Sequence, residues 1–189
     1  PPRSTLFPYT TLFRSSLFPL GEKWILIVSV HSHEGAVYSI YYTGQYTVDR
    51  FIPDGPPRLL DGGAEGCFYA PQTFIERKGQ RVMFGWLREC RSEQAQVLAG
   101  WSGAISIPRY LSLDENGDLS INPEPALERL RKTHEKLIRP NQISENVKGG
   151  CLEMLIRVPP DTEKWSGVHL LDNLQNGILI GYEIGRAHV

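Results

Sequence analysis

The sequence has 189 residues, enough for one ordinary domain or for parts of two. Hydrophobic residues make up 41% and charged residues 22%, a globular composition that excludes a disordered chain. The formal net charge of −1 gives no electrostatic reason to expect a nucleic acid or an anionic membrane as a partner. No apolar run reaches the roughly 20 residues of a membrane-spanning helix, so no membrane partner is expected.

Short runs rich in β-branched and aromatic residues fill the chain up to residue 122. They lie between Gly, Pro and Asp clusters that favour turns. Their regular spacing predicts an all-β sandwich, barrel or propeller. The expected strands cover residues 24–30, 36–43, 46–52, 67–76, 81–88 and 101–113.

The pattern changes at residue 123. Residues 124–136 (EPALERLRKTHEK) place apolar side chains on one side and charges elsewhere, and Pro125 suits the first turn of a helix. We therefore predict a short linker helix over residues 123–137 and a domain boundary within it. Strand-like runs return after the linker at 151–158, 168–171 and 177–182.

Few residues form a pattern that carries chemistry by itself. His31 and His33, two apart on a predicted strand, face the same side, but no third ligand accompanies them. A solvated strand end is therefore expected rather than half of a metal site. No nucleotide-binding, nucleophile-elbow or zinc-protease motif is present, and neither a cofactor nor a metal is expected. Composition alone selects no catalytic pair among the candidate acids Asp61, Glu65, Glu76, Glu89 and Glu93.

The two ends of the chain differ in character from the rest. Residues 5–15 (TLFPYTTLFRS) and 184–189 (IGRAHV) both resemble translations of short-read sequencing adapters. Such segments are set aside in reasoning about the fold. Residues 1–16 and 183–189 are therefore expected to be non-native, and the native portion to be a piece of a longer protein.

Several sequence blocks, in a fixed order, carry a family resemblance. Together they resemble glycoside hydrolase family 32, which includes invertases, levanases and inulinases. The blocks are residues 17–29 (LFPLGEKWILIVS), 67–74 (CFYAPQTF), 81–89 (RVMFGWLRE), 101–113 (WSGAISIPRYLSL) and 122–130 (NPEPALERL).

The resemblance implies a five-bladed β-propeller followed by a β-sandwich. Residues 17–122 would then form a partial propeller, with the end of the third blade and the fourth and fifth blades. The linker helix at 123–137 would lead to the start of the sandwich at 138–182.

The resemblance also implies a retaining glycosidase mechanism. In such enzymes one carboxylate attacks the sugar and a second acts as acid and then base, about 5 Å away. Alignment to the family places the nucleophilic and the stabilising Asp before residue 1, and the acid/base Glu at Phe13. Phe13 has no proton to exchange, so no catalytic residue is expected in this chain. We predict no hydrolysis by the chain as written.

Part of the sugar-binding pocket is expected to remain. The resemblance places Trp86 at the sugar, Asp61 and Tyr69 near the pocket, and Glu89 and Trp101 as neighbours. The three aromatic residues have an alternative role as core residues of the blades, which the sequence leaves open.

The parent protein is expected to hydrolyse terminal β-fructofuranosides and release fructose from sucrose or fructans. One alternative is a fructosyltransferase on the same scaffold, in which an acceptor sugar replaces water. Another is a non-catalytic carbohydrate-binding module with only stacked aromatic side chains to offer. The cellular compartment stays open between cytoplasm and exterior.

Overall fold

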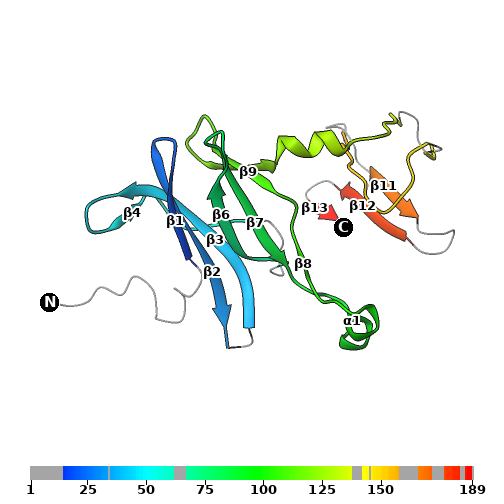
Figure 1. The fold of residues 1–189 in the computed structure, drawn as a ribbon, viewed down its shortest axis with the longest axis horizontal. Helices are drawn as coiled ribbons and strands as arrows, with labels where there is room; N and C mark the ends of the chain where they lie inside the picture. Colours follow the sequence, from blue (N-terminus) through cyan, green and yellow to red (C-terminus); the bar gives the residue numbers. More distant parts are fainter. Residues whose placement is uncertain are drawn as a thin grey trace. The chain divides into compact units, whose positions relative to one another are not determined.

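A computed structural model describes residues 15–33, 35–61, 67–137, 142–144, 146–157, 166–171, 177–183 and 186–188. The chain divides into two units, Pro1–Arg131 and Lys132–Val189 (Figure 1). Antiparallel strands dominate the regular structure of both units, which confirms the expected mostly-β fold. Phe13, Glu65, residue 158 and most of the two adapter-like ends lie outside the described residues.

The first sheet of the first unit is an antiparallel meander in the order β1-β2-β3-β4, with β5 paired to β3. Its first turn holds two residues, because Leu20 pairs directly with Lys23, and Gly21 supplies the positive φ of 57° that such a tight turn favours. The strands are β1 (Ser15–Leu20), β2 (Lys23–Ser32), β3 (Gly35–Tyr46), β4 (Phe51–Pro53) and β5 (Arg58–Leu59).

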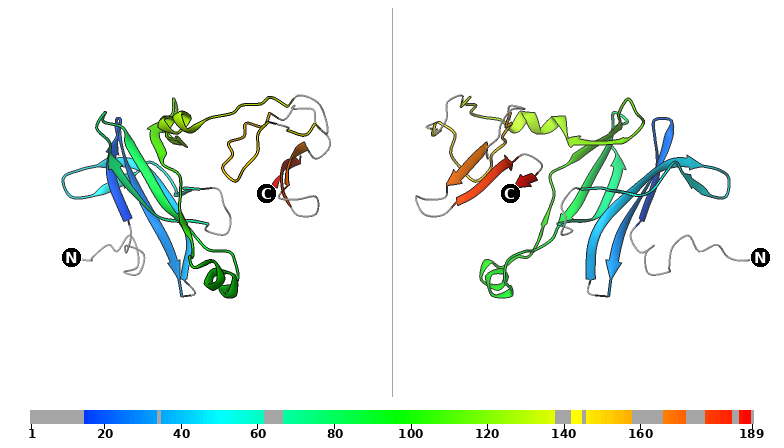
Figure 2. Two further views of the ribbon diagram at one scale, coloured as in Figure 1. Left: turned by 45° about the vertical axis from the view of Figure 1, so that its right-hand side comes forward. Right: turned by 180° about the vertical axis from the view of Figure 1, so that it is seen from behind.

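The second sheet of this unit has the order β10-β9-β7-β6, with β8 paired to β7. Its green strands lie beside the blue and cyan strands of the first sheet (Figure 2). A seven-residue helix, α1 (Glu93–Ala99), lies in the chain between β7 and β8. The strands are β6 (Phe68–Ile75), β7 (Arg81–Leu87), β8 (Ala104–Ile105), β9 (Arg109–Leu113) and β10 (Leu119–Pro123).

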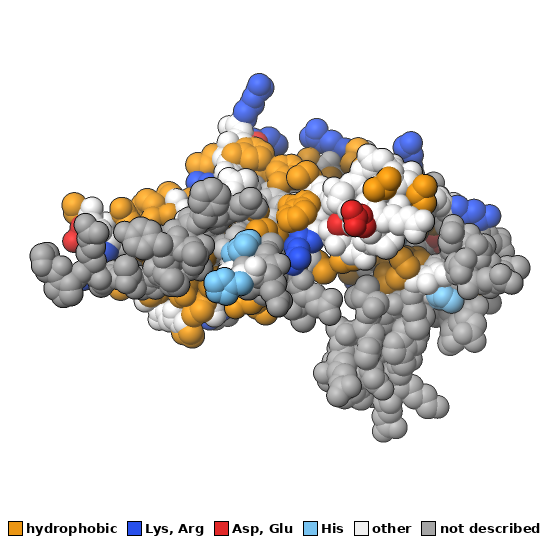
Figure 3. All heavy atoms as spheres, turned by 90° about the horizontal axis from the view of Figure 1, so that it is seen from below, with side chains coloured by type: hydrophobic (Ala, Val, Ile, Leu, Met, Phe, Trp, Pro, Cys, Tyr) orange, Lys and Arg blue, Asp and Glu red, His pale blue; other side chains and the backbone are white. Residues whose placement is uncertain are grey.

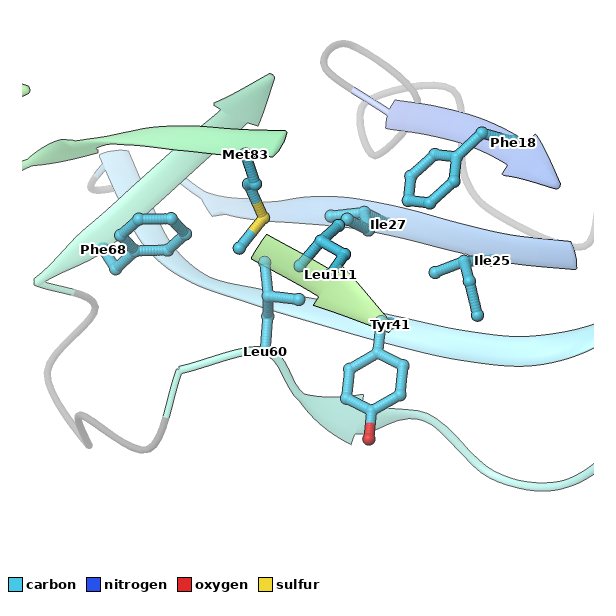
Figure 4. Close-up of a cluster of buried hydrophobic side chains, with 8 residues drawn as sticks. All are labelled: Phe18, Ile25, Ile27, Tyr41, Leu60, Phe68, Met83 and Leu111. Atoms are coloured by element: carbon cyan, nitrogen blue, oxygen red, sulfur yellow. The ribbon is translucent and has the colours of Figure 1, made fainter. Parts of the chain in front are cut away.

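Apolar side chains from both sheets form one core. Strand alternation brings the buried faces together, and burial of each large apolar side chain contributes about 1.5–3 kcal/mol. Ile25 and Met83 are fully buried. The cluster consists of Phe18, Ile25, Ile27, Tyr41, Leu60, Phe68, Met83 and Leu111 (Figure 4).

The helices differ from the sequence-based expectation. The linker helix is shorter than predicted: a 3-10 helix, η1 (Pro125–Leu130), is followed by residues 131–137 without regular structure. None of its residues is buried and its N-terminus has no side-chain cap, so packing and capping do little to extend it. The sequence also missed α1, which buries no residue and therefore shows no amphipathic pattern. Its caps were the available signals, Ser92 at the start and Gly100 with φ 76° at the end.

The strand pattern of the first unit also differs in detail. The predicted strand 101–113 is two strands, since Pro108 lies between β8 and β9. β1 and β10 were not predicted. Because β1 pairs with β2, it belongs to the same sheet as β2–β4. The described part of this unit holds two sheets, and their division into blades stays a prediction.

The described part of the second unit contains a three-stranded antiparallel sheet in the order β11-β12-β13. The strands are β11 (Ser166–Leu171), β12 (Gly177–Glu183) and β13 (Arg186–His188). The runs predicted at 168–171 and 177–182 fall within β11 and β12. Residues 151–157, predicted as a strand, have no regular structure.

Candidate functional site

The end of β7 places two aromatic side chains next to each other. Trp86 on β7 pairs in register with Tyr69 on β6. Met83 on β7 faces the core shared with the first sheet, so strand alternation puts Trp86 on the opposite face of the second sheet. Tyr69 is 2% exposed and Trp86 is partly buried.

A bulge in β6 shapes the backbone beside this pair. The register with β7 shifts between Tyr69 and Gln72, and Ala70 has a positive φ of 49°. The left-handed conformation costs a residue with a side chain about 1–2 kcal/mol. Bulges bend a strand and re-aim its side chains, and backbone strain of this kind concentrates at functional sites. No pattern in the amino-acid sequence predicted this bulge.

Glu89, two residues after the end of β7, is held by hydrogen bonds at both carboxylate oxygens. Arg91 donates from Nε to Oε1 at 2.9 Å and from Nη2 to Oε2 at 2.6 Å. The backbone N–H groups of Cys90 and Arg91 donate to Oε1 at 3.0 and 2.8 Å, and that of Gly103 donates to Oε2 at 3.1 Å. The Glu89 side chain is 12% exposed.

These hydrogen bonds set the charge of the cluster. Those from the Arg91 side chain, and then those from the backbone, hold the pKa of Glu89 well below its usual range, and Glu89 in turn raises the pKa of Arg91. Glu89 is therefore a carboxylate at neutral pH. It accepts hydrogen bonds and has no proton to give to a leaving group.

Arg91 and Gly103 connect Glu89 to both tryptophans. Arg91 Nη2 also donates to the backbone oxygen of Trp101 at 3.0 Å, and its guanidinium carbon lies 3.8 Å from the centre of the Trp101 ring. Trp101 is 57% exposed, so it is not a core residue. Gly103 has φ 64°, and a Cβ there would lie 2.3 Å from Nε1 of Trp86.

Asp61 belongs to a different cluster. Arg109 Nη1 donates to Asp61 Oδ2 at 2.7 Å, and the Arg109 guanidinium carbon lies 4.1 Å from the centre of the Phe68 ring. Arg109 pairs in register with Met83, on the face of the second sheet that packs on the first. Asp61 and Trp86 are therefore attached to opposite faces of this sheet.

The structure thus joins three of the five predicted site residues, Trp86, Glu89 and Trp101. Tyr69 supports Trp86 from the neighbouring strand, and Asp61 stands apart. Sequence reasoning missed Arg91, Gly103 and Arg109. Gly103 and Arg109 lie in the quoted block 101–113, whereas Arg91 follows a strand with no recognisable pattern.

A shallow pocket lies between β2, β3 and the β4–β5 segment of the first sheet, with Asp118 of the β9–β10 turn at its edge. Its charges are balanced, because Lys23 pairs with Asp54 at 2.9 Å and Arg58 with Asp118 at 2.6 Å. Hydrogen bonds and charge attraction from Asp118 raise the pKa of Arg58. A pocket with its charges already paired offers little to an ionic ligand.

Within the described residues, no three His, Cys, Asp or Glu side chains gather in a way that could hold a metal ion, and His31 and His33 are both exposed. None of the helices in the described ranges is long and apolar enough to cross a bilayer. On the face shown in Figure 3, the Lys and Arg side chains of the described residues lie in separate places and form no continuous basic patch.

Comparison with known proteins gives consistent matches. Residues 12–123 match the model of the glycosyl hydrolases family 32 N-terminal domain. The chain is 36% identical over 119 residues to a beta-fructofuranosidase, insoluble isoenzyme 1, of Daucus carota, covering 58% of this chain and 20% of that protein. It is also 36% identical over 124 residues to a fructan 1-exohydrolase of Bromus pictus, covering 62% and 20%. A variant of the Bombyx mori GH32 beta-fructofuranosidase in complex with sucrose aligns at 26% identity and a TM-score of 0.53, covering 63% of this chain and 27% of that one.

The fold and these matches point to one family of proteins, the glycoside hydrolases of family 32. Because the family model covers more than half of the residues, the chain belongs to glycosyl hydrolase family 32. The N-terminal domain of this family is a β-propeller. The chain spans about a fifth of the length of the two curated relatives named above.

Proposed function

We propose that this chain is part of an enzyme that releases fructose from sucrose or fructans by hydrolysing terminal β-fructofuranosides. The match of residues 12–123 to the family's N-terminal domain carries the proposal. The names of the relatives, a beta-fructofuranosidase and a fructan 1-exohydrolase, support this substrate class. The scaffold of the proposed whole enzyme is a five-bladed propeller joined to a β-sandwich. The two four-stranded paths of the first unit are the size of propeller blades.

Trp86 is the residue proposed to line the sugar. An indole ring presents an apolar face for stacking and an N–H group for a hydroxyl, and Trp86 is partly exposed at the end of its strand. Trp101, with its larger exposed area, extends the aromatic surface, and buried Tyr69 supports Trp86. Glu89 belongs to the site as a charged residue bound to Arg91, whereas Asp61 is bound to Arg109 on the other face of the sheet.

We further propose that the 189-residue chain does not hydrolyse sugars by itself. A retaining glycosidase needs two carboxyl groups about 5 Å apart, one of them protonated before the reaction. Arg91 keeps Glu89 ionised, and Asp61 is paired with Arg109 on the other face of the sheet. In both cases the carboxylate is engaged by an arginine and not placed opposite a second carboxylate. We assign the reacting carboxylates to other parts of the whole enzyme, as the family resemblance implies.

Two measurements test these proposals. The purified 189-residue chain is incubated with sucrose and with 1-kestose, and fructose release should stay at the level of buffer. Turnover that disappears on substitution of one of its own Asp or Glu residues would refute the inactivity. The whole protein that contains this segment should release equal amounts of glucose and fructose from sucrose. Longer fructosides as the main product would instead indicate a transferase, and no reaction at all would indicate a binding module.

A further inference from the structure

We propose that Glu89 is a positioning residue that holds residues 101–103 against Trp86 and thereby fixes the indole ring. The effect of Glu89 on sugar binding rests on the proposed function, because that function places the Trp86 ring against the substrate. The contact itself exists without sugar and can be tested without it. Glu89 would then act on the substrate only through Trp86.

The carboxylate of Glu89 has no acceptor site left for a sugar hydroxyl. Two ionised carboxylate oxygens offer about four lone-pair directions. Five N–H groups already point at them: three from Arg91, one from Cys90 and one from Gly103. A direct substrate contact would have to displace one of these charge-assisted hydrogen bonds, which are about twice as strong as neutral ones.

The same contacts close the base of the loop between β7 and β8 that contains α1. Glu89 and Gly103 are 14 positions apart in sequence and are joined at 3.1 Å, and Arg91 reaches the backbone oxygen of Trp101. Gln96 of α1 donates to the backbone oxygen of Arg91 at 2.8 Å. Since α1 buries none of its residues, packing of this helix does not hold the loop in place. The pairing of β8 with β7 fixes Ala104 and Ile105 beside Leu87 and Trp86. The hydrogen bonds around Glu89 extend this restraint to residues 101–103.

Gly103 passes the restraint on to Trp86. The backbone of Gly103 lies so close to the indole that even a Cβ would come within 2.3 Å of Nε1. A shift of residues 101–103 toward the ring is sterically blocked, and a shift away leaves one edge of the ring without contact. The hydrogen bond between Gly103 and Glu89 thus adds to the pairing of β8 with β7 in setting the orientation of Trp86.

The test uses the indole N–H signals of the ¹⁵N-labelled 189-residue chain. Glu89→Gln keeps the shape of the side chain but replaces one acceptor oxygen by a donor. It should move the indole signals of Trp86 and Trp101, assigned through Trp86→Phe and Trp101→Phe, and leave that of Trp24 in place. Hydrogen exchange of the Gly103 amide should accelerate by about tenfold, the order expected for loss of one charge-assisted hydrogen bond.

Glu76→Gln is the matched control. Its carboxylate accepts from the backbone N–H groups of Lys78 and Gln80 in the β6–β7 turn, away from Trp86. It should leave the Trp86 and Trp101 signals unchanged. If Glu89→Gln does not fold, Arg91→Lys keeps the charge but loses the planar fork, and it should move the same two signals. An unmoved Trp86 signal in a folded variant of either kind overturns the proposal.

Titration with sucrose separates this inference from the proposed function. If the Trp86 signal moves in Glu89→Gln but does not respond to sucrose or 1-kestose in the native chain, the positioning role of Glu89 is supported and the sugar-binding role of Trp86 is not. If the Trp86 signal of the native chain responds to sucrose but does not move in Glu89→Gln, the sugar-binding role is supported and the positioning role is overturned.

Discussion

Replacement of Gly103 by alanine tests the contact between the 101–103 segment and Trp86 directly. Two costs add at this position. The positive φ of 64° is unfavourable for any residue with a Cβ, at about 1–2 kcal/mol. The new Cβ would also lie 2.3 Å from Nε1 of Trp86 and 3.1 Å from the backbone oxygen of Leu87, and such overpacking costs about 1–3 kcal/mol. Gly103→Ala should therefore destabilise the chain by about 2–5 kcal/mol.

Gly100→Ala is the control that isolates the contact. Gly100 has a similar φ of 76°, and a Cβ there would meet no atom within 4 Å. Gly100→Ala bears only the conformational cost, so it should lower the free energy of unfolding by about 1–2 kcal/mol. The difference between the two variants then measures the collision with Trp86.

Urea unfolding of both variants, followed by tryptophan fluorescence, gives the two free energies of unfolding if the slopes agree. The indole signal of Trp86 should move only in Gly103→Ala. Equal destabilisation by the two alanines, with Trp86 unmoved in both, would refute the close approach and with it the path from Glu89 to the ring.

Three further predictions concern the core, the second ion pair and acid. Met83→Ala, at a fully buried position, should lower the free energy of unfolding in urea by about 2–5 kcal/mol. Leu98→Ala, at an 82% exposed position of α1, should change it by no more than about 0.5 kcal/mol, and equal effects would contradict the assigned core. A double-mutant cycle with Asp61→Asn and Arg109→Ala should give a coupling of about 1 kcal/mol or less that shrinks in high salt, since both side chains are partly solvated; a zero coupling in low salt would contradict the pair. The lowered pKa of Glu89 means that its stabilisation is complete above its unfolded pKa of about 4.3 and is lost only as the pH falls through the lower folded value. The indole signal of Trp86 should thus hold its position from neutral pH to about pH 4 and move at lower pH, and a midpoint near 4.3 would show that the carboxylate is not held.

Local patterns in the sequence were enough for the class of fold. Alternating apolar and polar residues between turn-forming clusters reflect the two faces of a half-buried strand, which is a property of a few neighbouring residues. The strands β2, β3, β6 and β7 follow these patterns closely. Elements without a buried face, such as α1 and the shortened η1, left no such pattern.

The family was also readable from the sequence, because ordered blocks such as residues 67–74 and 81–89 resemble it at similar spacing. The partners of individual charges were not readable. Asp61 is bound by Arg109, 48 positions further along the chain. Gly103 donates to Glu89 across the loop that contains α1.

The amino-acid sequence by itself determined the mostly-β class and the family, and it supplied the aromatic residues that are proposed for the site. Tertiary structure alone decided that Trp86 and Asp61 lie on opposite faces of one sheet, and that Glu89 serves as an acceptor held ionised by Arg91. The physical reason is the range of the forces involved. Strand patterning arises from neighbours in sequence, whereas the state of a charge depends on groups that strand pairing and loop closure bring from distant positions.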